Sequence, residues 1–449
     1  MIEHMCSQPR DGRDAASIVF DLPGYDVVDA VDLPLGGRRV VVQARARDEA
    51  CPGCGVLSAR VHAWARQHVT ALPCGGDAVE VVVRKPRMVC AEPACPRRTF
   101  TQATDELPLR ARCSRRLREQ LVEAVVDSGR AVGEVAAAFG VAWWTVQNAI
   151  DAAAVTLPDA DTVAVRELGI DEHRFARARF FREPQTRSWR RIEPWMSTFV
   201  DARTGQVLGV VDGRGSTGIQ SWLEQRSLSW REGIKVVAID PSAPFRAAIT
   251  RALPRARVAV DHWHLVKLAN QAVTTVRQRV SREQHGRRGR KNDPVWAHRM
   301  LLLRAGDRLS LRALRRLQDV FDRDDPTDEI SAAWAVKEHT RMLLACNDIE
   351  SATTARGQLG IAVLAADMPE TWTLWNTINA WWDEIETFIT TGVTNARTEA
   401  ANTGVKHIKR TGRGYRNHDH YQARILLRSH RRTRRRRTLN QQGTTLKCE

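Results

Sequence analysis

The chain has 449 residues, of which 43% are hydrophobic and 27% charged. This length allows two to four domains with sizeable cores and excludes a miniature protein held together only by disulfides or metal. No apolar stretch approaches the roughly 20 residues that a membrane helix needs, which excludes a membrane-spanning protein. The 69 Lys and Arg against 52 Asp and Glu give a formal net charge of +17, and such an excess favours a polyanionic partner such as nucleic acid.

The first ten residues show no secretion signal, because Glu3 and His4 stand where a basic flank and an apolar core are required. We therefore expect a cytoplasmic protein. In that compartment the nine cysteines argue against a disulfide framework, so clustered cysteines indicate metal ligands or redox groups.

Two cysteine pairs follow an N-terminal segment, residues 1–50, that contains a strand-like run at 36–43. The first pair is Cys51 and Cys54, and the second is Cys90 and Cys95. Two short pairs of this kind typically bring four thiolates to one tetrahedral Zn²⁺ ion. We predict a zinc ribbon over residues 51–105 that holds structural zinc; the alternative is a set of unrelated reduced thiols.

A helical pattern covers residues 106–157. Leu117, Leu121 and Val125 recur every four residues, and after Gly140 comes a second amphipathic stretch. A short helix, a glycine turn and another helix predict a helix-turn-helix DNA-binding domain, although an ordinary three-helix bundle has the same pattern. The residues expected to face DNA are Trp143, Trp144 and Gln147.

The spacing of the apolar residues then changes to the pattern of an α/β domain. Strands are predicted at 162–170, 195–200, 206–211, 234–239 and 257–260, with helices at 217–230 and 244–253. Three strands, a helix, a strand, a helix and a strand are the order of a ribonuclease-H-like sheet with helices on both faces. We assign residues 158–264 to the first part of this catalytic core. The fold class is therefore multidomain α+β.

The rest of the chain is predicted to be helical. Residues 265–390 form an all-helical insertion, in which the Arg-rich stretch 281–292 suits a phosphate-contacting or mobile loop. Residues 391–427 complete the core with a helix at about 393–410. The Arg-dense run at 424–437 and the remainder of residues 428–449 indicate a basic tail, either DNA-contacting or merely solvated.

Three acidic residues form the predicted active site. Asp171 and Asp240 end two strands that are neighbours in this sheet order, and the last helix can carry Glu399 over them. Two-metal phosphoryl transfer needs such carboxylates around two cations. Oxygen ligands favour Mg²⁺ or Mn²⁺. A single Asp at the end of a strand is more often a turn or cap residue. The prediction therefore depends on all three acids occurring together, in this order along the chain.

Several collinear motifs carry a resemblance to a known family. They are Cys51-Pro-Gly-Cys54, Cys95-Pro-Arg-Arg-Thr-Phe100, Gly169-Ile-Asp-Glu172, Asp261-His-Trp-His264-Leu-Val-Lys-Leu, Thr394-Asn-Ala-Arg-Thr-Glu399-Ala-Ala-Asn402, Lys406-His-Ile-Lys-Arg410 and Gly414-Tyr-Arg-Asn417. From Cys51 to about Leu427 the chain resembles the ISL3 family of bacterial insertion-sequence transposases, which carry an Asp-Asp-Glu triad. It departs from the family pattern in Trp263 for Phe, in Ala400 for Gly, and in a long Arg-rich segment at 174–191.

The resemblance implies a triad of Asp171, Asp240 and Glu399 that binds Mg²⁺, with Asp261 able to replace Asp240 as the second acid. Asp261 and His264 correspond to an Asp-x-x-His pair, which would position a metal-bound water or a flipped base; the alternative for His264 is a core histidine. Further DNA contacts are expected from the helix that bears Glu399, through Asn395, Asn402, Lys406, Lys409 and Arg410.

The function implied is that of a transposase which binds terminal inverted repeats, cuts DNA and joins the freed 3′-hydroxyl to target DNA. Two ends must be held together, so a homodimer or larger assembly on DNA is expected, associated with the bacterial nucleoid. The helical insertion would shape the DNA channel or help to seal hairpins on flanking strands. The alternative function is a catalytically silent, domesticated DNA-binding regulator.

Overall fold

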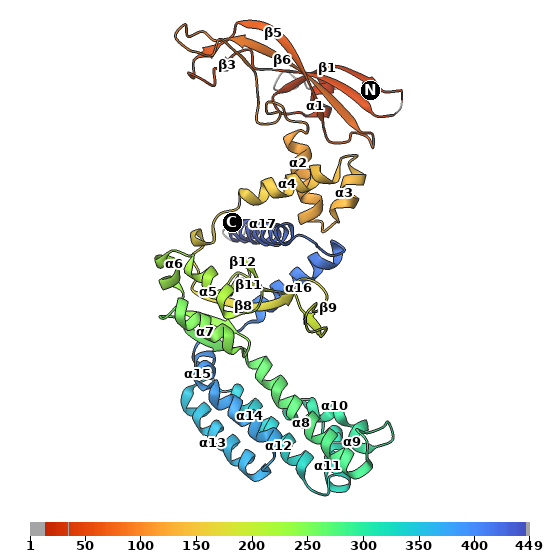
Figure 1. Cartoon of the computed structure of the whole chain (residues 1–449), viewed down its shortest axis with the longest axis vertical. Coiled ribbons are helices and arrows are strands. Elements are labelled where there is room, and N and C mark those ends of the chain that lie inside the picture. The colour runs from red at the N-terminus through yellow and green to blue at the C-terminus, as the bar shows by residue number, and fades with distance from the viewer. Residues whose placement is uncertain (1–13, 35, 446–449) are drawn as a thin grey trace, which may run out of the picture. The chain divides into compact units, whose positions relative to one another are not determined.

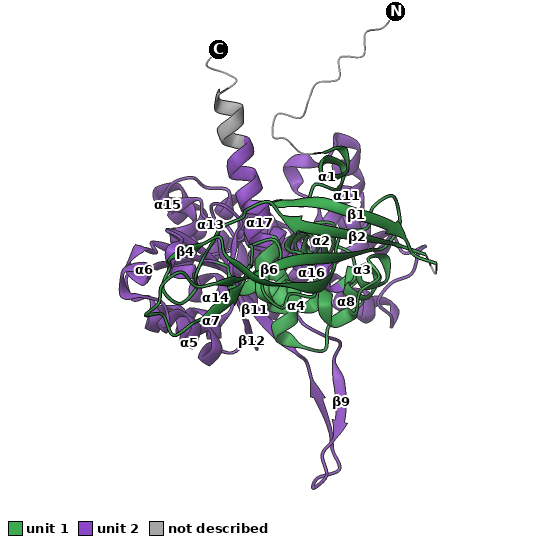
Figure 2. Ribbon diagram, turned by 90° about the horizontal axis from the view of Figure 1, so that it is seen from above, with its two compact units in different colours: residues 1–157, 410–428 green, residues 158–409, 429–449 purple. Residues whose placement is uncertain are grey.

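The computed structural model describes residues 14–34 and 36–445. The chain forms two compact units, one of residues 1–157 with 410–428 and the other of residues 158–409 with 429–449 (Figure 2). Each unit is described by itself.

The first unit contains a twisted sheet with strand order β1-β2-β6-β5, and β7 pairs with β6. Its elements are α1 (Ala15–Phe20), β1 (Tyr25–Asp32), β2 (Arg38–Ala44), β5 (Val61–Thr70), β6 (Val79–Val89) and β7 (Thr99–Thr101), and a small ladder pairs β3 (Glu49–Ala50) with β4 (Leu57–Ser58). The N-terminal segment expected at 1–50 is thus not separate, because β2 pairs in parallel with β6 of the cysteine-bearing region. Alternating valines of β6, Val79, Val81 and Val83, lie in the core.

Lys85 lies in the middle of β6 with only 2% of its surface exposed. Its ammonium group donates a hydrogen bond to the carbonyl oxygen of Leu107 at 2.8 Å. Burial lowers the pKa of Lys85 to about 8.

Three helices complete the first unit: α2 (Arg115–Val126), α3 (Val132–Ala138) and α4 (Trp143–Val155). The side chain of Ser114 caps α2 by accepting a hydrogen bond from the Leu117 amide. Gly140 has φ +63°, the left-handed conformation that the predicted turn between α3 and α4 requires. The core of this bundle contains Leu121, Val125 and Ile150.

The C-terminal run predicted as a basic tail is instead the helix α17 (His418–Thr445). In the first unit, Leu427 joins the core of the helical bundle. Arg424 is buried and donates hydrogen bonds to the carbonyl oxygens of Val125 and Arg130. The arginine density misled the prediction, because a guanidinium group that binds helix-end carbonyls can be packed inside.

The second unit is built on a five-stranded sheet with strand order β12-β11-β8-β13-β14 (Figure 1). The strands are β8 (Glu167–Arg174), β11 (Trp195–Asp201), β12 (Val207–Asp212), β13 (Val236–Ile239) and β14 (Arg257–Val260). β11 pairs antiparallel with β8 and β12, whereas β13 pairs in parallel with β8 and β14. The adjacency of the first and fourth predicted strands is therefore confirmed.

Two boundaries differ from the prediction. β8 starts at Glu167 and continues past Asp171, because a short helical turn, η1 (Ala160–Thr162), occupies the beginning of the predicted strand. The single helix expected at 217–230 is two helices, α5 (Ser216–Glu224) and α6 (Leu228–Gly233), since the Ser227 hydroxyl caps a new helix. α7 (Ala243–Ala252) follows β13 as expected.

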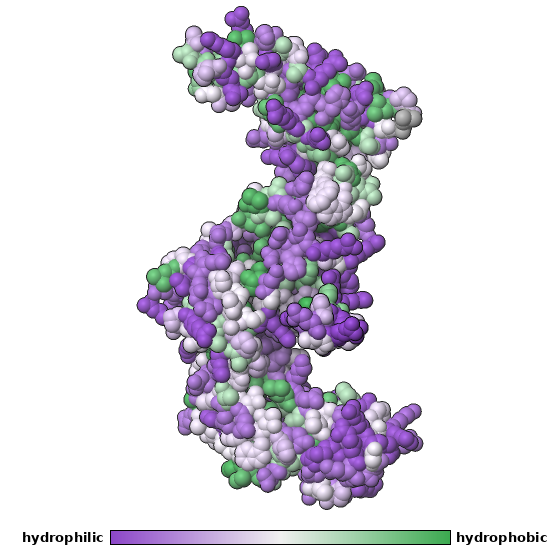
Figure 3. Space-filling view, in the orientation of Figure 1, coloured by the Kyte–Doolittle hydropathy of each residue, from purple (hydrophilic) through white to green (hydrophobic). Residues whose placement is uncertain are grey.

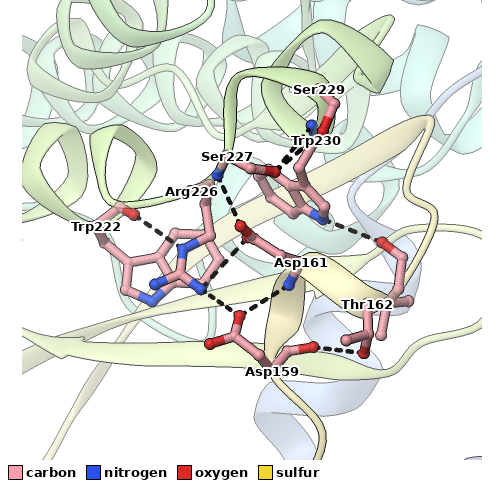
Figure 4. A network of polar contacts seen from close by, with 9 residues as sticks. Asp159, Asp161, Thr162, Trp222, Arg226, Ser227, Ser229 and Trp230 are labelled. Atoms are coloured by element: carbon pink, nitrogen blue, oxygen red, sulfur yellow. Dashed lines mark hydrogen bonds and ion pairs between the residues drawn. The ribbon is translucent and has the colours of Figure 1, made fainter.

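A polar network fixes the chain just before β8 (Figure 4). Arg226 donates to Asp159 at 2.8 Å, and the Ser227 amide donates to Asp161 at 2.7 Å. The Trp230 indole donates to the carbonyl oxygen of Val163 at 3.0 Å. These contacts tie the entry of β8 to the α5–α6 connection, and so help to position Asp171 along its strand.

An unpredicted hairpin of β9 (Arg179–Arg182) and β10 (Trp189–Ile192) leaves the sheet between β8 and β11 and projects from its unit (Figure 2). Every residue of both strands is exposed. Among its large hydrophobic residues, the most exposed are Phe180 (61%) and Trp189 (70%).

The helical insertion predicted for residues 265–390 is confirmed as helical. It comprises α8 (His262–His285), α9 (Pro294–Ala297), α10 (Arg299–Leu303), η2 (Gly306–Arg308), α11 (Leu311–Asp324), α12 (Glu329–Leu344), α13 (Ile349–Ala366), α14 (Pro369–Ala380) and α15 (Trp382–Thr391). The helix α16 (Ala396–Thr411) then returns the chain to the sheet. None of the helices in the described part of the chain has both the length and the apolarity that crossing a bilayer requires.

We predict that Lys85→Met makes the stability of the chain less dependent on pH. In the chain without the substitution, Lys85 keeps its proton up to about pH 10.5 in the unfolded state. In the folded state it loses this proton near pH 8. The unfolded state therefore binds more protons in this window, and the free energy of unfolding should rise with pH by on the order of 1–3 kcal/mol. Chemical unfolding between pH 7.5 and pH 10 should show a smaller rise in Lys85→Met, and the exposed Lys235→Met should behave like the parent.

Candidate active site and thiolate cluster

The strand pairing places two aspartates side by side. β8 and β13 are parallel, and Ile239 pairs with Ile170, so that Asp240 and Asp171 are the next residues along the two strands. Asp171 lies within β8 and pairs with Thr198 of β11, whereas Asp240 directly follows the last residue of β13. The sequence prediction expected this neighbourhood from strand order alone.

The helix α16 lies directly against β8. A Cβ atom at Gly169 would overlap the hydroxyl oxygen of Thr398, so only glycine allows this approach. Thr398 is fully buried, and its hydroxyl has no hydrogen-bond partner in the described structure. Close packing, and not a polar contact, sets the distance between helix and strand here.

Two asparagines, Asn395 directly before α16 and Asn402 within it, hold the aspartates. Asn402 donates from Nδ2 to Oδ2 of Asp171 at 2.7 Å, and Asn395 donates from Nδ2 to Oδ1 of Asp240 at 3.1 Å. Asn395 is 0% and Asn402 2% exposed. The expectation that these two residues face DNA is therefore wrong: both are buried and donate to carboxylates.

His264 connects two further carboxylates at the same edge. Its Nε2 lies 3.0 Å from Oδ2 of Asp240, and its Nδ1 lies 2.9 Å from Oδ2 of Asp261. Ionised carboxylates only accept hydrogen bonds, so an imidazole that binds two of them carries two protons; where Asp240 is protonated or a cation is bound, one proton on the ring is enough. Asp261 is 4% exposed and lies at the end of β14. His264 is thus a polar bridge of the site and not an apolar core histidine.

Burial dominates the electrostatics of this site. It raises the pKa of Asp171, against the hydrogen bonds from Asn402 and the Glu172 amide. Burial and then repulsion by Asp171 raise the pKa of Asp240 to about 7. Burial opposes a charge on His264, but the hydrogen bond to Asp261 and the charges of Asp240, Asp261 and Glu399 together raise its pKa.

Glu399 lies on α16 between the two asparagines, at four residues from Asn395 and three from Asn402, but its side chain is exposed. In the described structure its carboxylate makes no hydrogen bond or ion pair. Its charge nevertheless acts on His264. The structure thus brings Asp171, Asp240, Asp261 and His264 together and leaves the Glu399 carboxylate at their edge, as repulsion between like charges favours.

The donor set suits a divalent cation. Asp240, Asp261 and His264 each offer a ligand atom within 4.8 Å of the others. Asp171 lies beside this set; desolvation raises the pKa of Asp171 and of Asp240, and repulsion by Asp171 raises that of Asp240 further. A cation bound by their oxygens would relieve both effects.

Sequence reasoning missed two contributors to this site. Glu172 follows Asp171, donates its amide to that carboxylate at 2.7 Å and has a pKa raised by burial. Thr398 contacts Gly169. The spacing of Asn395, Glu399 and Asn402 already showed that they share a helix face, and this signal could have assigned the asparagines to the site.

The three basic residues of α16 that we expected to contact DNA lie toward its other end. Lys406 and Arg410 are exposed, as a DNA contact requires, whereas Lys409 is half-buried and donates to the carbonyl oxygen of Arg174 at 2.7 Å.

On α4 of the other unit, Trp143 and Trp144 are 40% and 62% exposed and form an edge-to-face pair beside His420. Gln147, which we expected to face DNA, is 3% exposed and donates to Asp151. It is excluded from direct readout because Val146 and Ile150 place its side of α4 in the core.

The four cysteines converge as predicted. All four sulfurs lie within 4.8 Å of one another, with Cys51 and Cys95 4.0 Å apart and Cys54 and Cys90 3.6 Å apart. Zn–S bonds of about 2.3 Å in a tetrahedron place sulfurs about 3.8 Å apart, so the cluster has the dimensions of a structural zinc site.

Comparison with known proteins agrees with this architecture. A family model described as transposase, of the ISL3 group, matches residues 168–425, which contain the whole aspartate site. The zinc-finger model of transposases IS204, IS1001, IS1096 and IS1165 matches residues 48–95, and the helix-turn-helix model of the ISL3 transposases matches residues 102–154.

A relative with a similar sequence points the same way. The transposase for insertion sequence element IS1001 of Bordetella parapertussis is 24% identical over 319 residues, which cover 66% of this chain and 70% of that protein. Fold, site and matches together define a transposase with its own DNA-binding domains. The chain belongs to the ISL3 family.

We predict that Gly169→Ala lowers the free energy of unfolding by about 1–3 kcal/mol, because overpacking pushes α16 away from β8. Thr398→Ala in the same chain should restore most of this loss, since the Thr398 hydroxyl makes no hydrogen bond in the described structure. Chemical unfolding of the parent, the single variants and the double variant measures the effect. A Gly169→Ala chain as stable as the parent would contradict the close packing.

A second prediction concerns the cysteine cluster. Natively purified protein should contain about one zinc per chain, and Cys90→Ser should lose it together with thermal stability of the N-terminal domain. Elemental analysis and melting curves with and without chelator test this. Cys74→Ser, a cysteine of the same domain outside the cluster, should keep its zinc; a zinc-free parent would refute the prediction.

Proposed function

We propose that this transposase cuts DNA at the ends of its insertion sequence and joins the freed 3′-hydroxyl to target DNA, using divalent cations held by Asp171, Asp240 and Glu399. One observation carries the proposal: Asp171 and Asp240 follow directly after paired residues of two parallel strands, both half-buried and both with raised pKa values. Carboxylates with pKa values raised in this way are typical of functional sites, including sites that bind a cation.

The strand order supports a ribonuclease-H-like core. Numbered along the chain without the hairpin, the sheet runs 3-2-1-4-5, with the first three strands antiparallel and the last two parallel to the first. In such a sheet the ends of strands 1 and 4 meet at one edge, and the helical insertion enters after strand 5. This proposal assigns residues 158–264 and 391–409 to one catalytic core. The sequence analysis also placed residues 410–427 there, but they belong to the other compact unit.

The proposed roles follow from the contacts. Asp171, Asp240 and Glu399 would hold Mg²⁺ or Mn²⁺, which lowers the pKa of water and stabilises the charge that develops on the phosphate oxygens. Asn395 and Asn402 orient the two aspartates through one oxygen each. Asp261 orients His264, and His264 contacts Asp240, so these two residues act as positioning residues.

We further propose that the helix-turn-helix domain binds the terminal inverted repeats. Trp143 and Trp144 are the exposed aromatic residues at the start of α4, where side chains of a recognition helix approach the groove. Exposed Lys406 and Arg410 would contact phosphates. Two transposon ends must be processed together, which requires a dimer or larger assembly on DNA.

Cleavage of a supercoiled plasmid that carries the element's ends tests the catalytic assignment. Asp171→Asn, Asp240→Asn and Glu399→Gln should each lower the cleavage rate about 100-fold or more with Mg²⁺, because each removes a charged ligand worth several kcal/mol. Asp261→Asn should cost only about tenfold, because Asp261 acts through His264.

The exposed acid Asp319 provides a control, and Asp319→Asn should cut like the parent. DNA binding by each variant should stay intact, which separates lost catalysis from lost recognition. If Asp171→Asn cuts as fast as the parent, the triad is wrong. If neither the parent nor any variant cuts the plasmid while all of them bind the repeats, the chain is a DNA-binding regulator.

A further inference from the structure

The helical insertion contains a pocket of about 350 Å³ between α8, α9 and α10. This volume equals that of about ten water molecules in the liquid. Its lining includes two arginines, Arg277 and Arg299, and no acidic residue. The remaining walls are apolar or neutral, among them Trp296 and Met300.

Arg277 is the unusual member. Its side chain is only 5% exposed, yet it makes no ion pair with a carboxylate in the described structure. One hydrogen bond, from Nη1 to the carbonyl oxygen of Arg288 at 3.3 Å, is its polar contact. Burial, and then the charge of Arg299, lower its pKa. Buried charges are normally paired, so this guanidinium group lacks the anion that its position calls for.

Arg299 faces the same space in a fixed orientation. Its guanidinium carbon lies 3.7 Å from the centre of the Trp296 ring, and Nη1 donates to the carbonyl oxygen of Trp296 at 2.9 Å. A stacked guanidinium group keeps its remaining N–H groups directed sideways, which suits the oxygens of a phosphate.

The surroundings extend this positive charge. The connection after α8 carries exposed Arg288, Arg290 and Lys291, and Arg277 holds its backbone. The surface over α9–α11 is predominantly hydrophilic (Figure 3). The predicted phosphate-contacting stretch 281–292 is partly helical, since α8 continues to His285, and its loop portion lies beside the pocket.

Arg279, two residues along α8, shows what a structural arginine looks like in the same helix. It forms ion pairs with Glu329 at 2.7 Å and Glu370 at 3.0 Å, and the hydrogen bond to Glu370 raises its pKa. Arg277 has no such partner. This difference indicates that Arg277 binds a ligand, whereas Arg279 stabilises the fold through its ion pairs.

We propose that the α8–α10 pocket binds a phosphate group, shared by Arg277 and Arg299, and that this phosphate belongs to a DNA strand. Met300 and the apolar wall would contact the adjoining sugar. The insertion thereby provides a second DNA-binding point outside the helix-turn-helix. The inference rests on the proposed function only in taking DNA as the source of the phosphate.

Binding of the full chain to a fluorescent DNA duplex without divalent cation tests the proposal. Arg277→Met and Arg299→Gln should weaken binding about 5- to 20-fold and lower the slope of log affinity against log salt by about one. Arg277→Met should not lower the melting temperature without DNA, because it removes an unpaired buried charge. Arg279→Met should lower the melting temperature and leave DNA affinity within about twofold.

Inorganic phosphate provides the second arm. If millimolar phosphate stabilises the parent but not Arg277→Met, while DNA affinity is the same for both, the pocket takes a free phosphate and the DNA source is wrong. If neither DNA nor phosphate distinguishes Arg277→Met from the parent, or if Arg277→Met unfolds as readily as Arg279→Met, the pocket is structural and the proposal fails. No part of the measurement needs cleavage, so failure of the catalytic triad would leave it interpretable.

Discussion

The close contact between α16 and the middle of the sheet determines the geometry of the candidate site. Gly169 removes a side chain from β8, Thr398 fills the space, and Asn395 and Asn402 then reach the two aspartates on neighbouring strands. α16 begins more than 130 residues after the end of β14, and the helical insertion lies between them in the sequence. Because the site is built from such distant segments, the positions of its side chains depend on this one packing contact.

Much of this arrangement could be predicted from the sequence, because the signals were local and periodic. Alternating apolar runs gave the sheet strands, and the strand order placed Asp171 beside Asp240. The cysteine spacing gave the thiolate cluster, and the stripe of Leu117, Leu121 and Val125 gave α2. These predictions depend on which face of an element is apolar, which the sequence displays directly.

The errors have a common physical origin: the sequence does not say what a polar residue binds. Asn395, Asn402, Gln147 and Arg424 all looked like surface residues, yet each is buried and donates a hydrogen bond to a carboxylate or a carbonyl oxygen. Only tertiary packing supplies such a partner. The Arg-rich segment after β8 was likewise seen as an anomaly, since a hairpin with two exposed faces lacks the alternation that marks a half-buried strand.

That hairpin has a consequence for handling the protein. A two-stranded ribbon with Phe180, Phe181 and Trp189 exposed has free edges on both sides, and such edges recruit strands from other molecules. The arginines interspersed along it act as gatekeepers, since their mutual repulsion discourages edge-to-edge stacking. High concentrations of polyvalent anions would screen that repulsion, and the ribbon would then become the place where aggregation starts.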